Sequence, residues 1–575
     1  MKKNTIKTLS LVALVSVGLA ACNPLKKMDK YAENIKYSVN PDPLEMHGDS
    51  VEVNISGKIP PKYFHKLATV KAKAVLKNAD GEVVKELKEM TLLGNEADGD
   101  GKKIDYEKGG SFSYTDKIAY EPIMENVQLF VQATGSFKTK TQEFESRKIG
   151  DGTITTPYLV QSDARPILAK DNFKKVIPHT VEAQIHYLIQ SSQVRSTELR
   201  DEDIKAFTEF VEMAVANEYV FKGVTVSAYA SPDGEMDLND NLANNRAKTA
   251  AQAIMRILKR KKVEAAKAEG FITEIGKGED WEGFEKATKA SDIEDKDIIL
   301  GVLKMNADNA KREAEIKNMA AVYVELAEKV LPSLRRSMIT LNADEMARTD
   351  EEITALTKSN PDTLSVEELL YAATLTNDLD EKLRIYKLAQ SQYPSDWRAH
   401  NNVGYVMVLQ NNVSGAKAEF EKAASAQNTP IVSNNLGVCE LFEGNTAKAE
   451  GLFKSASGAG PEVSYNMGII NIKKGDYGTA VSKFGGEKTF NAALAQMLNG
   501  NNDGALKTLD ASEAKATAEG YYLKAVIGAR TSNNDMVTSN LKSAFGLEGK
   551  LKSKAANDAE FISLREDAAF SGLVK

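Results

Sequence analysis

Three stretches in the C-terminal half of the chain decide its fold there: residues 400–409 read HNNVGYVMVL, residues 433–442 read SNNLGVCELF and residues 464–473 read SYNMGIINIK. A glycine recurs in each at spacings of 33 and 31 residues, and two other residue types keep the same intervals: Gly404, Gly437 and Gly468; Ala416, Ala449 and Ala480; Phe420, Phe453 and Phe484. Such self-similarity indicates helical units that bury their apolar faces by stacking on one another. We therefore expect an all-α solenoid over residues 363–575.

The pattern of small and aromatic residues resembles the tetratricopeptide repeat. Trp397 falls where a second unit begins and Pro461 where a unit ends. Residues 369–393 look like a degenerate first unit, and residues 492–511 and 518–545 like irregular later ones. The resemblance implies a superhelix with a concave groove that binds peptides or other proteins.

An asparagine recurs at one position of the first helix of each unit, at Asn402, Asn435 and Asn466. In the repeat family that position tends to face the groove, so these side chains are candidates for hydrogen bonds to an extended partner peptide. Bonding between helices inside the solenoid is an equally good interpretation. Cys439 lies just after Gly437 and is expected to be a small buried apolar residue rather than a nucleophile.

The N-terminus carries a predicted targeting signal. Lys2, Lys3 and Lys7 precede an apolar run, and Leu19-Ala20-Ala21-Cys22 follows, which resembles the lipobox of bacterial lipoproteins. The resemblance implies a signal peptide over residues 1–21, acyl chains on Cys22 that anchor the protein stably, and a lipidated linker over residues 22–35. It favours the outer membrane. The absence of an acidic run after Cys22 favours the periplasmic face, and surface exposure stays open.

Residues 36–160 read as a small antiparallel β-sandwich. Val51–Ser56, Val70–Leu76 and Val127–Ala133 alternate apolar and polar residues, which is the period of a half-buried strand. Turn signals rich in Pro, Gly and Asp separate these runs. No group in this domain suggests chemistry.

Residues 178–342 alternate strand and helix patterns in the order βαβαβ. Asn239-Asp240-Asn241-Leu242-Ala243-Asn244-Asn245-Arg246-Ala247 resembles the helix motif of the OmpA-like C-terminal domain, in Bacteroidota-type envelope proteins among others. The stretch after Phe271 and the Arg335-Arg336 strand resemble its later strands. Residues 281–330, charged and mostly helical, look like an insertion, and residues 343–362 like a linker.

The OmpA-like resemblance implies a site for the stem peptide of peptidoglycan. In that family an arginine donates a pair of hydrogen bonds to a carboxylate of diaminopimelate, and an aspartate binds the amine of the same residue. Arg246 matches the arginine, and Asn239 is in register with the motif. The aspartate position holds Ser231, which supplies no charge for an ammonium group, while Asp233 lies two residues further on.

Composition and motifs argue against an enzyme. Lys and Arg number 74 and Asp and Glu 81, a net charge of −7, so the chain as a whole is not built to coat nucleic acid. Two cysteines exclude a disulfide framework, and the five histidines show no helical metal-binding spacing. No phosphate loop, nucleophile elbow or dinucleotide fingerprint is present. We expect no catalytic residues, no cofactor and no metal.

The fold class is thus a multidomain α+β chain: a β-sandwich, an OmpA-like βαβαβ domain with a helical insertion, and a tetratricopeptide-type solenoid. Two functions follow. In the first, the lipoprotein tethers the outer membrane to peptidoglycan and recruits envelope proteins through its repeats. In the second, the OmpA-like domain no longer binds peptidoglycan and the chain is a scaffold subunit of an outer-membrane secretion or assembly complex. Ser231 favours the second, and the retained Arg246 favours the first.

Overall fold

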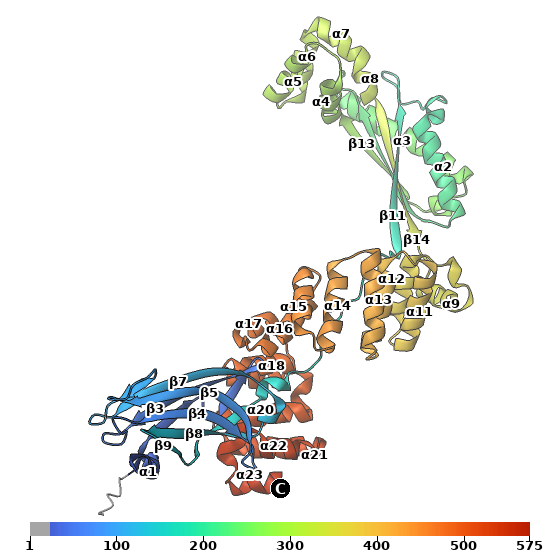
Figure 1. Ribbon diagram of the computed structural model, residues 1–575. Coiled ribbons are helices and arrows are strands. Elements are labelled where there is room, and N and C mark those ends of the chain that lie inside the picture. Colours follow the sequence, from blue (N-terminus) through green and yellow to red (C-terminus); the bar gives the residue numbers. More distant parts are fainter. Residues whose placement is uncertain (1–22) are drawn as a thin grey trace, which may run out of the picture. The chain divides into compact units, whose positions relative to one another are not determined.

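The computed structural model describes residues 23–575 (Figure 1). The predicted signal peptide, residues 1–21, and the predicted lipidation site Cys22 lie outside the described residues. The contacts divide the chain into two compact units: one runs up to Ala169 and resumes at Tyr393–Lys575, and the other is Lys170–Gln392. Each unit is described by itself.

The N-terminal part of the first unit is a β-sandwich, as predicted. Its strands pair in the order β1-β3-β2-β10-β8-β4-β5-β6, with β7 beside β3 and β9 beside β8. Their bounds are β1 Lys36–Asn40, β2 Leu44–His47, β3 Ser50–Ile59, β4 Thr69–Lys77, β5 Val83–Gly94, β6 Lys102–Ile104, β7 Gly110–Ala119, β8 Val127–Phe137, β9 Lys140–Glu143 and β10 Arg147–Ile154. Alternate residues of β3 and of β4 and β8 pack together between the two layers. The pairing is not wholly antiparallel, because β2 with β10 and β5 with β6 run parallel.

The predicted lipidated linker of residues 22–35 is folded almost from its start. Helix α1 (Pro24–Lys30) buries Leu25 and Met28 in the apolar core at one end of the sandwich. The Asp29 carboxylate accepts hydrogen bonds from the Gln142 side chain and the Glu145 amide, both at 3.0 Å. The linker prediction was wrong because the lysines of this short stretch suggest an exposed segment, whereas its two apolar side chains, Leu25 and Met28, are buried.

The second unit contains a four-stranded sheet in the order β11-β14-β12-β13. The strands are β11 Val176–His186, β12 Val220–Ala230, β13 Ile272–Glu279 and β14 Arg336–Met346. Helices α2 (Glu202–Ala216) and α3 (Met236–Arg260) cover one face and share one apolar core with it (Figure 1). Only β12 and β13 pair in parallel. The predicted βαβαβ order is therefore present; we call this part the middle domain.

The helical insertion of the middle domain begins directly after β13. It comprises α4 (Trp281–Ala290), α5 (Lys296–Met305), α6 (Asn309–Asn318), α7 (Ala320–Lys329) and α8 (Leu331–Leu334). These helices have an apolar core of their own, and lie at the end of the sheet where β13 ends (Figure 1).

The predicted linker of residues 343–362 is also structured. Strand β14 continues to Met346, and helix α9 (Asp350–Ser359) follows with a capping box formed by Thr349 and Glu352. Ile353 of this helix is fully buried. The prediction missed this helix because its exposed face is strongly charged. Helices α10 (Val366–Ala372) and α11 (Leu379–Gln392) complete the second unit.

In the first unit, residues 393–575 form helix pairs that stack as a solenoid, as the periodicity predicts. The pairs are α12 Trp397–Leu409 with α13 Val413–Ala426, α14 Pro430–Phe442 with α15 Thr446–Ser455, α16 Pro461–Lys474 with α17 Tyr477–Phe484, α18 Phe490–Leu498 with α19 Asn502–Asp510, and α20 Ala518–Arg530 with α21 Asn534–Leu547. Helices α22 (Leu551–Asn557) and α23 (Ala568–Val574) end the chain. Pro461 opens α16 rather than closing a unit, because proline fits the first helical position, where no amide partner is needed.

Contact between the two helices of a pair explains the glycine and phenylalanine periods. A Cβ added to Gly437 would lie 2.7 Å from the ring of Phe453, and the same relation joins Gly404 to Phe420 and Gly468 to Phe484. Each phenylalanine is buried against its glycine. The repeat signature is therefore a close approach of two helices that no larger residue allows.

The sandwich packs against the C-terminal helices within the first unit. The Thr156 hydroxyl donates to the Glu560 carboxylate, which also accepts from Arg530 Nε at 3.0 Å. The His47 ring lies 5.7 Å from that of Tyr477. Because Glu560 is almost fully buried and paired with Arg530, this junction is a fixed internal contact.

Candidate functional site

The chain's own residues 161–169, which follow the sandwich, lie along the first helices of the repeats. We call this segment, Gln161–Ala169, the strap. Its path runs opposite to the repeat order, so that Gln161 contacts α18 and Ala169 contacts α12. The strap has no regular secondary structure of its own, and its backbone is bound by side chains.

Four asparagines each bind one strap residue at two points. The side-chain oxygen accepts from the strap amide, and the side-chain nitrogen donates to the carbonyl of the same residue. The two distances are 2.8 and 2.9 Å for Asn491 with Gln161, 2.7 and 2.9 Å for Asn466 with Arg165, 2.6 and 2.8 Å for Asn435 with Ile167, and 2.9 and 3.0 Å for Asn402 with Ala169. A primary amide offers a donor and an acceptor side by side, as a neighbouring β-strand does. We call these four residues the asparagine ladder.

A second row of asparagines supports the ladder. Asn435 donates to Asn401 Oδ1 at 2.9 Å, and Asn466 donates to Asn434 Oδ1 at 3.0 Å. Asn401 and Asn434 in turn donate to the carbonyls of Ile167 and Arg165. The repeated asparagines therefore bond both between helices and to an extended backbone, which here belongs to this chain and not to a partner protein.

The ladder is deeply buried: Asn435, Asn466 and Asn491 have no exposed surface and Asn402 is 1% exposed. Buried amides without partners would be strongly destabilising, so the geometry of the ladder depends on the strap.

In the second unit, residues 172–175 pack on α9 and α10. The Phe173 ring stacks on the Tyr371 ring at 4.5 Å between ring centres, and Lys175 pairs with Asp350 at 2.8 Å.

The sequence predicted three of the ladder residues, Asn402, Asn435 and Asn466, and missed Asn491. The missed residue starts the motif Asn491-Ala492-Ala493, in which alanine replaces the glycine of the other units. A search for asparagine followed two residues later by any small residue would have found it. No feature of the sequence indicates that the bound peptide belongs to the same chain.

The predicted stem-peptide arginine, Arg246, points into the middle domain. It is 1% exposed, and its guanidinium donates to three backbone carbonyls: Ser191 at 2.9 Å, Tyr229 at 2.8 Å and Leu188 at 3.3 Å. It lies over the Tyr187 ring at 5.1 Å. Burial lowers the pKa of Arg246 to about 10, which leaves it charged at neutral pH. The guanidinium thus holds the loop after β11 to the sheet.

The other predicted site residues form a separate network beside it. Arg335 donates to the Ser231 hydroxyl at 3.1 Å and to the Asp233 carboxylate at 3.0 Å. Ser231 itself donates to the second oxygen of Asp233 at 2.7 Å. The carboxylate that would meet an amine is therefore already neutralised by Arg335, a partner that the sequence did not indicate.

Asn239, the fourth predicted residue, ties the turn before α3 to the end of β13. Its side-chain amide donates to the carbonyls of Ser231 and Gly234 and to Glu279 at 3.0 Å. Burial and the charge of Asp233 both raise the pKa of Tyr323 on α7 of the insertion. The four predicted residues are thus brought into one region, where internal partners satisfy them.

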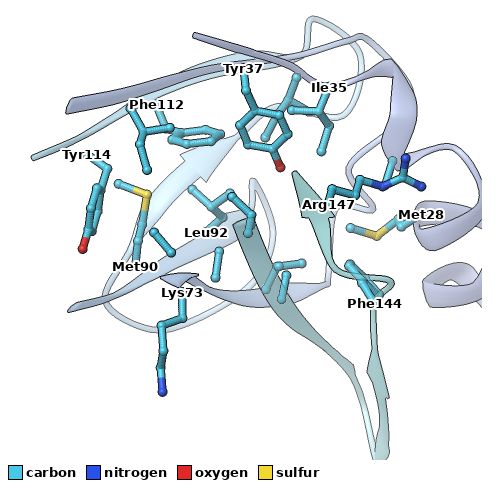
Figure 2. Close-up of a pocket in the computed structure, with 18 of the residues that line it drawn as sticks. Met28, Ile35, Tyr37, Lys73, Met90, Leu92, Phe112, Tyr114, Phe144 and Arg147 are labelled. Atoms are coloured by element: carbon cyan, nitrogen blue, oxygen red, sulfur yellow. The ribbon is translucent and has the colours of Figure 1, made fainter. Parts of the chain in front are cut away.

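A cavity of about 60 Å³ lies inside the sandwich (Figure 2). Apolar and aromatic side chains from both layers and from α1 line it, among them Met28, Tyr37, Leu92, Phe112 and Phe144, with Arg147 at its edge. An engineered cavity that binds benzene measures roughly 150 Å³, so this space is too small for a ligand of that size. No sequence prediction falls on it.

Within residues 23–575, no group of three or more His, Cys, Asp or Glu side chains is placed to hold a metal ion. No helix in the same range is both long enough and apolar enough to cross a membrane. Cys439 is a buried free thiol whose pKa burial raises to about 12, as expected for an unreactive core residue.

No family model matches the chain, and no curated protein sequence matches it. Solved structures similar to parts of it include a tetratricopeptide repeat protein from Parabacteroides merdae, with 16% identity over 35% of this chain and 85% of that one and a TM-score of 0.27. They also include YrrB, a tetratricopeptide protein with an unusual peptide-binding site (19% identity, 35% and 94% covered, TM-score 0.21), and the Cut9–Hcn1 complex (14% identity, 60% and 76% covered, TM-score 0.30). The C-terminal region resembles such solenoids, and its assignment as a helical-repeat domain rests on the helix pairs and glycine–phenylalanine contacts described above.

Proposed function

We propose that the chain is a non-enzymatic scaffold of the bacterial cell envelope, anchored by lipid on Cys22, whose repeat domain recognises extended protein segments. The observation that carries this is the asparagine ladder, which binds a peptide backbone at four residues through paired hydrogen bonds. Such contacts order a chain without activating any bond, which is the chemistry of protein recognition.

The state of the middle domain favours a scaffold over a wall tether. Arg246 is committed to three carbonyls, and Asp233 to Arg335 and Ser231. Binding diaminopimelate would require breaking the buried Arg335–Asp233 pair, which leaves an uncompensated charge. The assembly role proposed from Ser231 is therefore preferred to peptidoglycan tethering, the second candidate, which rests on the retained OmpA-like motif at Asn239 and Arg246.

Sedimentation with purified sacculi separates the two candidates. The scaffold account expects the full chain to stay in the supernatant with and without sacculi. Pelleting that is kept in Arg256→Ala but lost in an Arg246→Ala variant whose circular dichroism shows it to be folded would establish the tether instead. Arg256 is the matched control, because it is exposed on the same helix and its Nε donates only within that helix.

The lipid anchor is tested by fractionation of cells that express the full chain. We expect the protein in the outer membrane fraction and the Cys22→Ser variant released from it. A Cys22→Ser variant that stays in the membrane to the same extent would contradict the anchor. This experiment is independent of the sacculus assay, so either part of the proposal can fail alone.

A further inference from the structure

The strap contacts the repeats through its side chains as well as its backbone. We propose that the ladder surface is a sequence-selective receptor for an extended peptide of the pattern Asp-x-Arg-Pro-aliphatic-x-small, that residues 163–169 occupy it in cis, and that a partner protein carrying the pattern binds by displacing them. The inference deepens the proposed scaffold role and rests on it for the biological use of the surface.

The backbone contacts fix the register of the bound peptide. Arg165, Ile167 and Ala169 are each bound at both amide and carbonyl, so every second residue meets an asparagine. Pro166 falls between two bound residues, where the ladder takes no amide hydrogen. Proline there restricts the free peptide to extended conformations and lowers the entropy lost on binding.

Asp163 is recognised through both oxygens of its carboxylate. One carboxylate oxygen accepts from Asn491 Nδ2 at 2.7 Å, and the other accepts from the Tyr465 hydroxyl. Asn491 thereby contacts the peptide at both Gln161 and Asp163. A residue without an acceptor at position 163 leaves the buried Asn491 amide short of a partner.

Arg165 is recognised by two different groups. Its guanidinium lies 3.6 Å from the centre of the Tyr465 ring and pairs with Glu487 at 3.1 Å. Burial disfavours the charge, but Glu487 outweighs it and raises the pKa of Arg165. A stacked and paired arginine is not replaced well by lysine, because the planar guanidinium makes both contacts together.

The remaining positions are selected by space. Ala164 and Ile167 join the apolar core of the repeats at 5% and 8% exposure, and Ala169 is 2% exposed. A Cβ on Gly460 would lie 3.5 Å from Ile167 Cδ1, so the isoleucine side chain packs closely against Gly460. Larger residues at 164 or 169 would overpack these places.

Because the strap occupies the ladder surface in cis, it competes with weakly binding ligands for that surface. Both strap ends continue into folded parts of the chain, so its effective concentration at the ladder is about millimolar or higher. A displacing partner therefore needs contacts beyond the seven-residue pattern. Conversely, weakening the strap by substitution should expose a working receptor.

The test uses the full chain and a fluorescent peptide of residues 160–171, followed by anisotropy. The receptor chain carries Asp163→Ala, Arg165→Ala and Ile167→Ser, which remove three of the strap's side-chain contacts and leave the sequence of residues 393–575 unchanged. We expect this chain to bind the peptide about 100-fold more tightly than the wild-type chain, whose surface is filled. Peptides with Asp163→Ala or Arg165→Ala should bind about tenfold more weakly, whereas Ser162→Ala, at an exposed position, should bind equally.

Equal binding of all four peptides would overturn the sequence selectivity, and no binding to the folded receptor chain at about 1 mM peptide would overturn the receptor itself. Should the triple variant fail to fold, the single variant Arg165→Ala allows the same comparison. Adding Glu487→Ala to the receptor should reduce the preference for arginine, because only the Tyr465 ring contact remains, and should keep the preference for aspartate. The sacculus and fractionation assays do not depend on these outcomes.

Discussion

Asn435 binds Ile167, 268 residues away in the sequence, through both of the polar groups of its backbone. The same two-point contact recurs at three more residues of the strap, and it joins the first part of the chain to the repeats. The repeat domain is therefore built around a segment that precedes it by more than two hundred residues.

Removing one rung of the ladder should destabilise the repeats markedly. Asn435→Ala leaves the Ile167 amide and carbonyl without this partner, and we expect a loss of about 3 kcal/mol in the free energy of unfolding. Urea unfolding followed by Trp397 fluorescence in a Trp281→Phe background measures it. The control Asn540→Ala, whose side chain bonds only to Met536 within helix α21, should change little. Equal effects of the two substitutions would contradict the role of the ladder.

The glycine period predicts opposite effects for two glycine-to-alanine changes. Gly437→Ala places a Cβ 2.7 Å from the Phe453 ring and should destabilise the repeats by about 1–3 kcal/mol. Gly451→Ala, on α15 with nothing within 4 Å, should stabilise by about 0.5–1 kcal/mol through helix propensity. Thermal denaturation of the two variants checks the sign. A stabilising Gly437→Ala would disprove the close approach.

Glu440 should make the repeats lose stability in acid. Burial opposes its ionisation, but hydrogen bonds from Lys417, Lys448 and Asn445 prevail and lower its pKa to about 2. Because the folded value lies below the ordinary value of 4.5, the unfolded chain binds more protons between these pH values. The contribution is present above pH 4.5 and disappears as the pH falls towards 2.

Urea unfolding of wild type and Glu440→Gln at several pH values isolates this contribution. The stability difference between them should be largest near neutrality and shrink progressively in acid. The exposed Glu421→Gln variant on α13 should follow the wild type throughout. A difference that stays constant across the range would show that the lysines do not hold the Glu440 charge.

Arg246 is expected to stabilise the middle domain. Arg246→Met keeps the side-chain length but leaves the carbonyls of Ser191, Tyr229 and Leu188 without a donor, a loss of about 3 kcal/mol or more. Trp281 fluorescence in a Trp397→Phe background reports the unfolding. Arg256→Met should be within about 0.5 kcal/mol of wild type. If Arg246→Met leaves the free energy of unfolding unchanged, the structural role of Arg246 is wrong and a ligand-binding role is favoured instead.

Elements with a periodic sequence pattern could be predicted from the sequence, whereas contacts between residues distant in the sequence could not. The strands near Val51, Val70 and Val127, the two helices of the middle domain and the repeat units follow from local alternation or spacing, and each is present. The predicted linkers differ from the structure, which is folded over much of residues 23–35 and 343–362, because a few buried side chains such as Leu25 and Ile353 stabilise these segments among many charged ones.

The candidate sites show the same division. The type and spacing of Asn402, Asn435 and Asn466 indicate hydrogen bonding to a peptide backbone. No residue near them in the sequence shows that this backbone is that of Arg165 and Ile167. Likewise Ser231 signalled a departure from the OmpA-like pattern, but the pairing of Asp233 with Arg335, a hundred residues later, required the fold.

Hydrogen exchange of the strap amides in the full-length chain measures whether the asparagines hold the strap. We predict that the amides of Gln161, Arg165, Ile167 and Ala169 exchange as slowly as the core of the repeats, and that Asn466→Ala speeds exchange at Arg165 first. Exchange of these four amides at the rate of an unstructured peptide would show that the asparagines do not hold the strap.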